Sequence, residues 1–201
     1  MVDSGVTMHR FALALVAAMA RLGAAGADAA IIEVIHLAGL PGLIIAPPAE
    51  ALDDAIASAT HMLGFDERQN VTLTADLAVD GGAIPAGTTV SSHMILLNMP
   101  TGLPAAFGIN EWRFAGRILG VMSDRDGRLE AASTAQLGAP QTHYPQAGYG
   151  FRGIETNDRF AITAPNVLRV ELHVWQPGDW IRVITGPAPV AEGGAPAISA
   201  M

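Results

Sequence analysis

The segment RFAITAPNVLRVELHVWQPGDWIRVIT, residues 159–185, carries the clearest fold signal in this 201-residue chain. Its central part, residues 167–175, alternates apolar and polar side chains, which is the period of a strand with one buried face. The side chains expected on that buried face are Leu168, Val170, Leu172 and Val174. Asn166 and Pro177-Gly178 are turn-forming residues. The segment therefore predicts three antiparallel strands, at residues 159–163, 167–175 and 179–185.

Further strands are predicted upstream of this segment. Residues 31–39 form a β-prone run, and residues 71–79 alternate with a period of two. Residues 88–98 form another β segment that is apolar on both sides near its end, so we expect both of its faces to be covered. A long strand is expected over residues 112–122, with Trp112 on its core-facing side.

One short helix is predicted at residues 48–61, PAEALDDAIASATH, because Pro48 suits a first helical turn. Four apolar residues repeat there at helical spacing: Leu52, Ile56, Ala59 and Leu63. Residues 129–157 are rich in Gly and Pro and are predicted to form a long irregular loop. Short strands joined by turns dominate the rest, so we expect a mainly β fold, an antiparallel β-sandwich of jelly-roll type.

Residues 8–29 have the three parts of an export signal, which we expect to be helical. Met8-His9-Arg10 is followed by the apolar run FALALVAAMA and then by Ala27-Asp28-Ala29, which predicts cleavage between Ala29 and Ala30. The alternative is an amphipathic or membrane-spanning helix, but the apolar run is shorter than the roughly 18 residues that a span requires. We therefore expect a signal peptide at residues 1–29, with Met8 as an alternative start, and a secreted or cell-surface protein.

Composition limits what the remaining chain can do. About 170 residues are enough for one domain, expected at residues 30–187, and the Pro, Ala and Gly of residues 188–201 predict a disordered tail. The formal net charge is −8, which makes nucleic acid an unfavourable partner. The sequence has no Cys, which excludes disulfides, thiolate metal sites and a Cys nucleophile.

The order of several motifs resembles a family of exported bacterial proteins of unknown function, many of which carry a C-terminal PEP-CTERM sorting signal. The resemblance rests on six blocks: FDERQNVTL (65–73), AIPAGTTVSSHMI (83–95), WRFAGRILGVMSD (112–124), LEAASTAQLGAPQTHYP (129–145), FRGIE (151–155) and PGDWIRVIT (177–185). It implies a secreted or surface-displayed β-sandwich, often from bacteria that make exopolysaccharide, and it brings no catalytic residues. No Pro-Glu-Pro motif follows Thr185 in this sequence, so we expect no transmembrane anchor after signal removal.

Asp124, Asp126 and Glu130 are the candidate metal ligands, and calcium is the one cofactor that the sequence suggests. Carboxylates two residues apart and followed by Gly127 can point at one hard cation. The alternative is a solvated turn, which Asp-Gly favours by itself. Five histidines are scattered without the spacing of a zinc site: His36, His61, His93, His143 and His173.

Trp175, Trp180 and Tyr149 are the candidate ligand-binding residues, because flat aromatic side chains can stack on sugar rings. Trp175 should face outward if Leu168 faces inward, whereas Trp180 could lie on either side of its strand. The alternative for all three is ordinary packing.

Catalytic signatures are weak. No GxSxG motif is present, Ser91-Ser92 lies inside a strand pattern, and the GYGFRG run at 148–153 neither follows a strand nor opens a helix. Candidate acids for glycoside hydrolysis are Glu67, Asp76, Glu111 and Glu130, with no reason to prefer a pair.

We therefore expect an exported, non-enzymatic protein of the extracellular matrix or cell surface, whose partners are polysaccharide or other surface proteins. The alternatives are a carbohydrate-binding module and a hydrolase with its site in residues 129–157.

Overall fold

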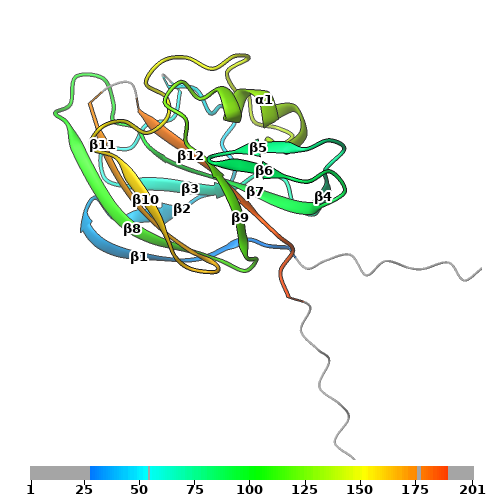
Figure 1. Cartoon of the computed structure of the whole chain (residues 1–201). Helices are drawn as coiled ribbons and strands as arrows, with labels where there is room; N and C mark the ends of the chain where they lie inside the picture. Colours follow the sequence, from blue (N-terminus) through cyan, green and yellow to red (C-terminus); the bar gives the residue numbers. More distant parts are fainter. Residues whose placement is uncertain (1–27, 54, 176–177, 190–201) are drawn as a thin grey trace, which may run out of the picture.

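The computed structural model describes residues 28–53, 55–175 and 178–189 (Figure 1). Most of the predicted signal and most of the predicted tail therefore lie outside the described residues. The predicted cleavage position stays a prediction. Ala29, at that position, is fully buried, and its backbone N–H donates to Gln69 Oε1 at 3.0 Å.

The described residues form two main sheets packed face to face. One sheet has four strands in the order β1 (Ile31–Gly39), β8 (Ala106–Phe114), β11 (Val167–Val174) and β10 (Arg159–Ala164). The other contains β2 (Gly42–Ile44), β3 (Met62–Asp66), β7 (Thr89–Leu97), β12 (Asp179–Thr185) and β9 (Ile118–Met122), with β4 (Val71–Thr72) also paired to β7. All pairs in both sheets are antiparallel except β2 with β3. The predicted antiparallel β-sandwich is confirmed.

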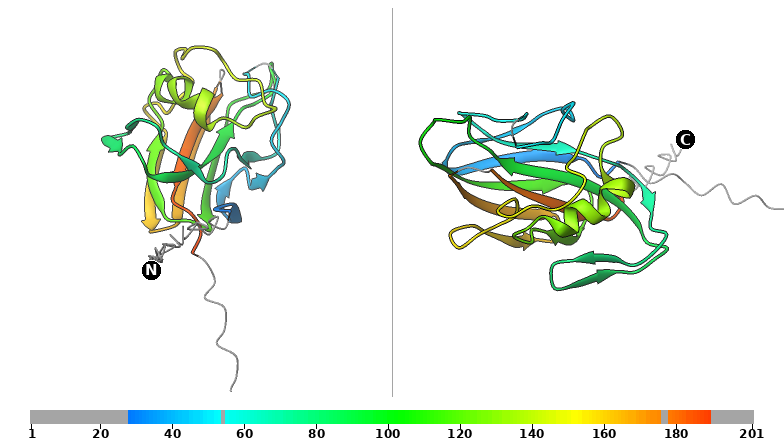
Figure 2. Two further views of the ribbon diagram at one scale, coloured as in Figure 1. Left: turned by 90° about the vertical axis from the view of Figure 1, so that its right-hand side faces the viewer. Right: turned by 90° about the horizontal axis from the view of Figure 1, so that it is seen from above.

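A small hairpin and a helix complete the fold. Strands β5 (Leu77–Val79) and β6 (Gly82–Ile84) pair only with each other, and Figure 2 shows this hairpin projecting from the body of the sandwich. The helix α1 (Arg128–Leu137) is the one helix in the part of the chain that the structure describes. It lies against the six-stranded sheet, on the side away from the four-stranded one (Figures 1 and 2).

The main core fills the space between the two sheets. The four predicted inward residues of β11 are buried there beside Trp112 and Phe114 of β8 and Ile95 of β7. The ring of Trp112 needs a glycine at position 64 in the opposite sheet, because a Cβ there would overlap it, and a Cβ on the neighbouring Gly42 would overlap Val34. Strand β7 is buried along Val90–Leu97 on both faces, as predicted.

A second layer of buried residues covers the outer face of the six-stranded sheet. It consists of α1, the loop at 138–158 and the segment at 45–58, and it buries Trp180, Phe65 and Tyr144. Two bidentate ion pairs lie inside this layer. Arg182 of β12 binds Glu67, and Arg152 of the loop binds Glu130 of α1. The layer is therefore held to the sheet by buried charges as well as by apolar contacts.

The helix predicted at residues 48–61 is wrong. Within the described residues of that segment there is only one hydrogen-bonded turn, between Leu52 and Ile56. Asn98 directly follows β7, and its Nδ2 donates to the backbone carbonyls of Asp53 and Ile56 at 2.6 Å each. These hydrogen bonds hold both carbonyls against the six-stranded sheet. The apolar residues Ala51 and Ile56 pack on that sheet without forming a helical face.

The loop predicted for residues 129–157 is wrong in its first part, which forms α1. Asp124 stabilises the start of this helix, because its two carboxylate oxygens accept the backbone N–H groups of Arg128 and Leu129 at 2.7 and 2.9 Å. Gly127, immediately before the helix, has the left-handed φ of 59° that suits glycine.

Two predicted strands are each divided in the structure. The strand expected over 71–79 becomes β4 and β5, and the one expected over 112–122 becomes the end of β8 and all of β9. The second break moves the chain from one sheet to the other at Gly116. A Cβ there would overlap the carbonyl oxygen of Gly186, so the crossing depends on glycine.

Candidate functional site

The outer face of the four-stranded sheet carries a continuous row of interacting side chains. Phe107 of β8 stacks on His173 of β11, with ring centroids 5.5 Å apart and planes 14° from parallel. His173 Nε2 lies 3.1 Å from Glu171 Oε1. Arg159 of β10 then donates two hydrogen bonds to Glu171, from Nε at 2.7 Å and from Nη2 at 2.9 Å. We call these four residues the outer ladder.

The outer ladder follows from strand register. Glu171 lies directly opposite Arg159, and His173 lies directly opposite Phe107, so three strands contribute to one row. Glu171 and His173 are two residues apart on β11 and therefore point to the same face of the sheet. Cross-strand pairs of this kind stabilise a sheet and also fix the side chains that they join.

Glu171 is held in its charged form. Hydrogen bonds from Arg159, and secondarily from His173, lower the pKa of Glu171 to about 2. The Glu171 side chain is 9% exposed, whereas that of Arg159 is 74% exposed. Glu171 therefore acts as a fixed anion that orients an otherwise mobile arginine on the surface.

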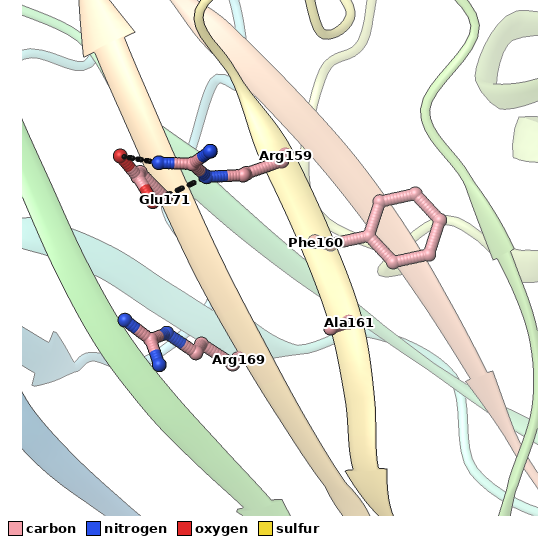
Figure 3. Close-up of a pocket in the computed structure, with 5 residues that line it drawn as sticks. All are labelled: Arg159, Phe160, Ala161, Arg169 and Glu171. Carbon is pink, nitrogen blue, oxygen red and sulfur yellow. Dashed lines mark hydrogen bonds and ion pairs between the residues drawn. The ribbon is translucent and has the colours of Figure 1, made fainter.

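A shallow hollow of about 320 Å³ lies beside the Arg159–Glu171 pair (Figure 3). Its lining residues are Arg159, Phe160, Ala161, Arg169 and Glu171. Ala161 lies directly opposite Arg169 in the register of β10 and β11, and its small side chain leaves room between the two arginines. Among the described residues, no hydrogen bond or ion pair holds the Arg169 guanidinium, and Figure 3 shows it extended along the sheet surface.

Trp175 is an exposed aromatic residue that lies close to the ladder in the chain. It follows His173 by two residues, just after the end of β11, and is 82% exposed. The outward position predicted for Trp175 is confirmed. An exposed Trp offers a large flat apolar surface with a polar N–H, a combination that is enriched at interfaces.

The other two predicted binding aromatics lie elsewhere. Trp180 is only 2% exposed, and the guanidinium of Arg152 lies 4.0 Å from the centre of its ring. The Tyr149 hydroxyl accepts a hydrogen bond from Arg152 Nη1 at 2.8 Å. Burial raises the pKa of Tyr149 above its usual value. The structure therefore brings Trp180 and Tyr149 together around Arg152, separate from Trp175, and Trp180 is not available as a stacking surface.

Tyr149 also lines a second hollow, of about 470 Å³, together with Glu50, Leu52, Asp53, Ala55 and Pro145. This hollow lies between the 50–55 segment and the long loop, where the alternative hydrolase reading expects a site. Asp53 Oδ1 there accepts the backbone N–H of Gly178 at 2.9 Å. Of the two carboxylates that line this hollow, Glu50 and Asp53, that of Asp53 thus has a structural role.

The three predicted metal ligands are engaged with other groups. Asp124 caps α1, and Asp126 pairs with Arg128 at 2.9 Å. Both oxygens of Glu130 bind Arg152, at 2.6 and 2.8 Å. In the described part of the chain, no group of three or more His, Asp or Glu side chains is placed to hold a metal ion. The calcium site stays a prediction.

Among the five histidines from His36 to His173, four make simple contacts. The ring of His36 lies beside the carbonyl of Gly39, and that of His61 contacts Thr60. His143 forms backbone hydrogen bonds with the 49–51 segment. His173 belongs to the outer ladder. His93 differs from these, because it is fully buried in β7.

His93 joins three strands of the six-stranded sheet. Its Nδ1 lies 2.7 Å from Asp66 Oδ1 and its Nε2 lies 3.0 Å from Thr185 Oγ1. An acid, a histidine and a hydroxyl in this order resemble a nucleophilic triad. However, Thr185 and His93 are both 0% exposed, so a substrate cannot reach the hydroxyl. The arrangement ties the end of β3 to β7 and β12.

Sequence reasoning missed most of the outer ladder. Arg169, Glu171 and His173 occupy the outward positions of the predicted strand at 167–175, and that pattern could have placed them on one face with Trp175. Phe107 and Arg159 come from other strands, and only the register joins them to that row.

Comparison with protein-family models, with curated proteins and with solved structures finds no match. Among the described residues, no helix combines the length and apolar character that crossing a membrane would require.

Proposed function

We propose that this chain is an exported, non-enzymatic β-sandwich protein that binds polysaccharide outside the cell through the outer face of its four-stranded sheet. The observation that supports the proposal most is the outer ladder together with the exposed Trp175. The export part of the proposal is supported by the sequence of residues 8–29, and a matrix or cell-surface location is proposed with it.

The chemistry of this face suits sugar rings. A pyranose has apolar C–H faces, which pack on aromatic side chains, and a rim of hydroxyls, which need hydrogen-bond partners. Phe107 and Trp175 supply exposed aromatic surface. Arg159 supplies charged hydrogen-bond donors next to it, already oriented by Glu171. Binding groups that are fixed before the ligand arrives lose little conformational entropy on binding.

The face is also electrically balanced, in contrast to the rest of the protein. Its strands carry three arginines and three glutamates on this side: Arg113, Arg159, Arg169, Glu33, Glu111 and Glu171. Glu33 pairs with Arg113 at 2.9 Å. The formal charge of −8 therefore lies on other parts of the chain, and this face can approach an uncharged polymer without a large electrostatic penalty.

Affinity electrophoresis of the full chain in gels containing a soluble polysaccharide tests the proposal. We expect retardation of the native protein and about fivefold weaker binding for Trp175→Ala, since one stacked aromatic typically contributes on the order of 1 kcal/mol. Phe151→Ala is the matched control, because Phe151 is 46% exposed but lies in the long loop. Equal loss in both variants, or no retardation by neutral or acidic polymers, would contradict the proposal.

Cell fractionation tests the export part separately. We expect the protein outside the cytoplasm with a new N-terminus close to Ala30. Recovery of only the full-length chain from the cytosol would contradict it.

A further inference from the structure

We infer that the hollow between Arg159 and Arg169 receives the carboxylate of an acidic sugar, so that the bound polymer contains uronic acid residues. The inference rests on the proposed function, because it identifies the ligand class of the same face. It depends on four residues: Arg159, Arg169, Glu171 and Ala161.

The hollow contains more cationic than anionic groups. It is lined by two guanidinium groups and one carboxylate, and the carboxylate of Glu171 is already bound by Arg159 through two nitrogens. Arg159 keeps its Nη1 for another partner, and in the described part of the chain Arg169 has all five of its N–H donors unused. One further carboxylate would complete the charge balance.

The shape of the hollow favours a planar anion. Ala161 forms its floor opposite Arg169, and Arg159 lies two residues before Ala161 on the same face of β10. Figure 3 shows both guanidinium groups extending to the same side, away from Ala161, so a carboxylate that contacts both would lie above β11 between them. The guanidinium fork matches a carboxylate geometrically, and charge-assisted pairs of this kind are about twice as strong as neutral hydrogen bonds.

One acidic residue of the protein competes for the same arginine. Glu111 of β8 lies directly opposite Arg169 in the register, although no ion pair joins their side chains in the described residues. A ligand carboxylate must therefore bind Arg169 against the attraction of Glu111. This competition gives a variant, Glu111→Gln, that should strengthen binding.

The test uses two forms of one polymer, polygalacturonate and its highly methyl-esterified form, which share a backbone and differ in free carboxylates. Assays at 0.15 M salt reduce the repulsion from the net charge of −8, because the screening length there is about 8 Å. We expect the native chain to bind the acid form about tenfold more tightly than the ester. Arg169→Gln should remove this preference, and Glu111→Gln should increase it.

Arg128→Gln is the matched control, because Arg128 is a 79% exposed arginine on α1. It should bind both forms as the native chain does. Native protein that binds the ester as tightly as the acid form would overturn the carboxylate inference and leave polysaccharide binding intact. Failure to bind either form would overturn both. An equal loss of preference in Arg128→Gln would show that overall charge, and not the hollow, decides the preference.

Discussion

Glu67 and Arg182 form a bidentate ion pair in which both side chains are 0% exposed, with Nε to Oε2 and Nη2 to Oε1 distances of 2.7 Å each. The remaining polar atoms of the pair are also bonded. Tyr144 donates to Glu67 Oε1, and Arg182 Nη1 donates to the carbonyl of Glu130 and to Ser133 Oγ on α1. The pair therefore joins β12, the residue after β3, the long loop and the helix.

Arg182→Met should destabilise the fold strongly. The substitution removes the cation but leaves Glu67 buried without its charge partner, and breaking a buried pair in this way costs about 3–5 kcal/mol. Urea unfolding of the purified chain measures the change. Arg128→Met, at an exposed arginine, should shift the free energy of unfolding by less than about 0.5 kcal/mol. Similar effects of the two substitutions would show that the buried pair contributes little.

Asp179→Asn should stabilise the protein at alkaline pH. Burial, followed by the nearby charges of Asp158, Glu155 and Asp53, raises the pKa of Asp179 from 3.8 to about 9. The folded state thus holds a proton that the unfolded state releases near pH 4, so native stability falls as pH rises from about 4 to about 9. One pKa unit corresponds to about 1.4 kcal/mol, so the variant should gain more than about 1 kcal/mol at pH 8 relative to pH 4.

The free energy of unfolding of both proteins at pH 4, 6 and 8 measures this difference. Parallel pH profiles for the native chain and Asp179→Asn would refute the prediction.

Arg159→Gln should raise the pKa of Glu171 from about 2 toward its ordinary value of 4.5. Because the folded pKa is depressed, the stabilisation by Glu171 is complete above about pH 4.5 and is lost as pH falls toward 2. Titration of the Glu171 carboxyl carbon by NMR reports the midpoint in the native and variant chains. A midpoint that stays near 2 in the variant would mean that Arg159 does not hold the carboxylate.

Gly64→Ala should destabilise the protein by about 1–3 kcal/mol, the range typical of overpacked cores. The added methyl group would overlap the ring of Trp112, which is itself fully buried. Gly82→Ala is the control, because nothing lies within 4 Å of a Cβ at that position. Thermal unfolding compares the two variants. Equal melting temperatures would contradict the tight packing of Trp112 on β3.

Strand β11 was predictable because it buries one face. The inward residues of β11 alternate regularly, and a period of two is visible without any tertiary information. Helix α1 was not predictable in this way. Its buried residues include Glu130 and Ser133, so its buried face has no apolar repeat. The segment at 48–61 has such a repeat, but Asn98 and the sheet below hold it in another conformation.

The candidate site was predictable only in part. Arg169, Glu171 and His173 share one face of β11, which the alternation shows directly. The partners of those residues depend on which strands lie beside β11. Glu67 and Arg182 are 115 residues apart in the chain, and no local pattern connects them.

The position of the outer ladder on β11 has one more consequence. This strand lies inside its sheet and is hydrogen-bonded on both sides, to β8 and to β10. The strand that carries Glu171 and His173 is therefore fixed within the sheet, and the proposed capture of a polymer would require no loop closure or domain movement. This face would be a preformed binding surface, on which the side chains keep the same arrangement in the free and the bound protein.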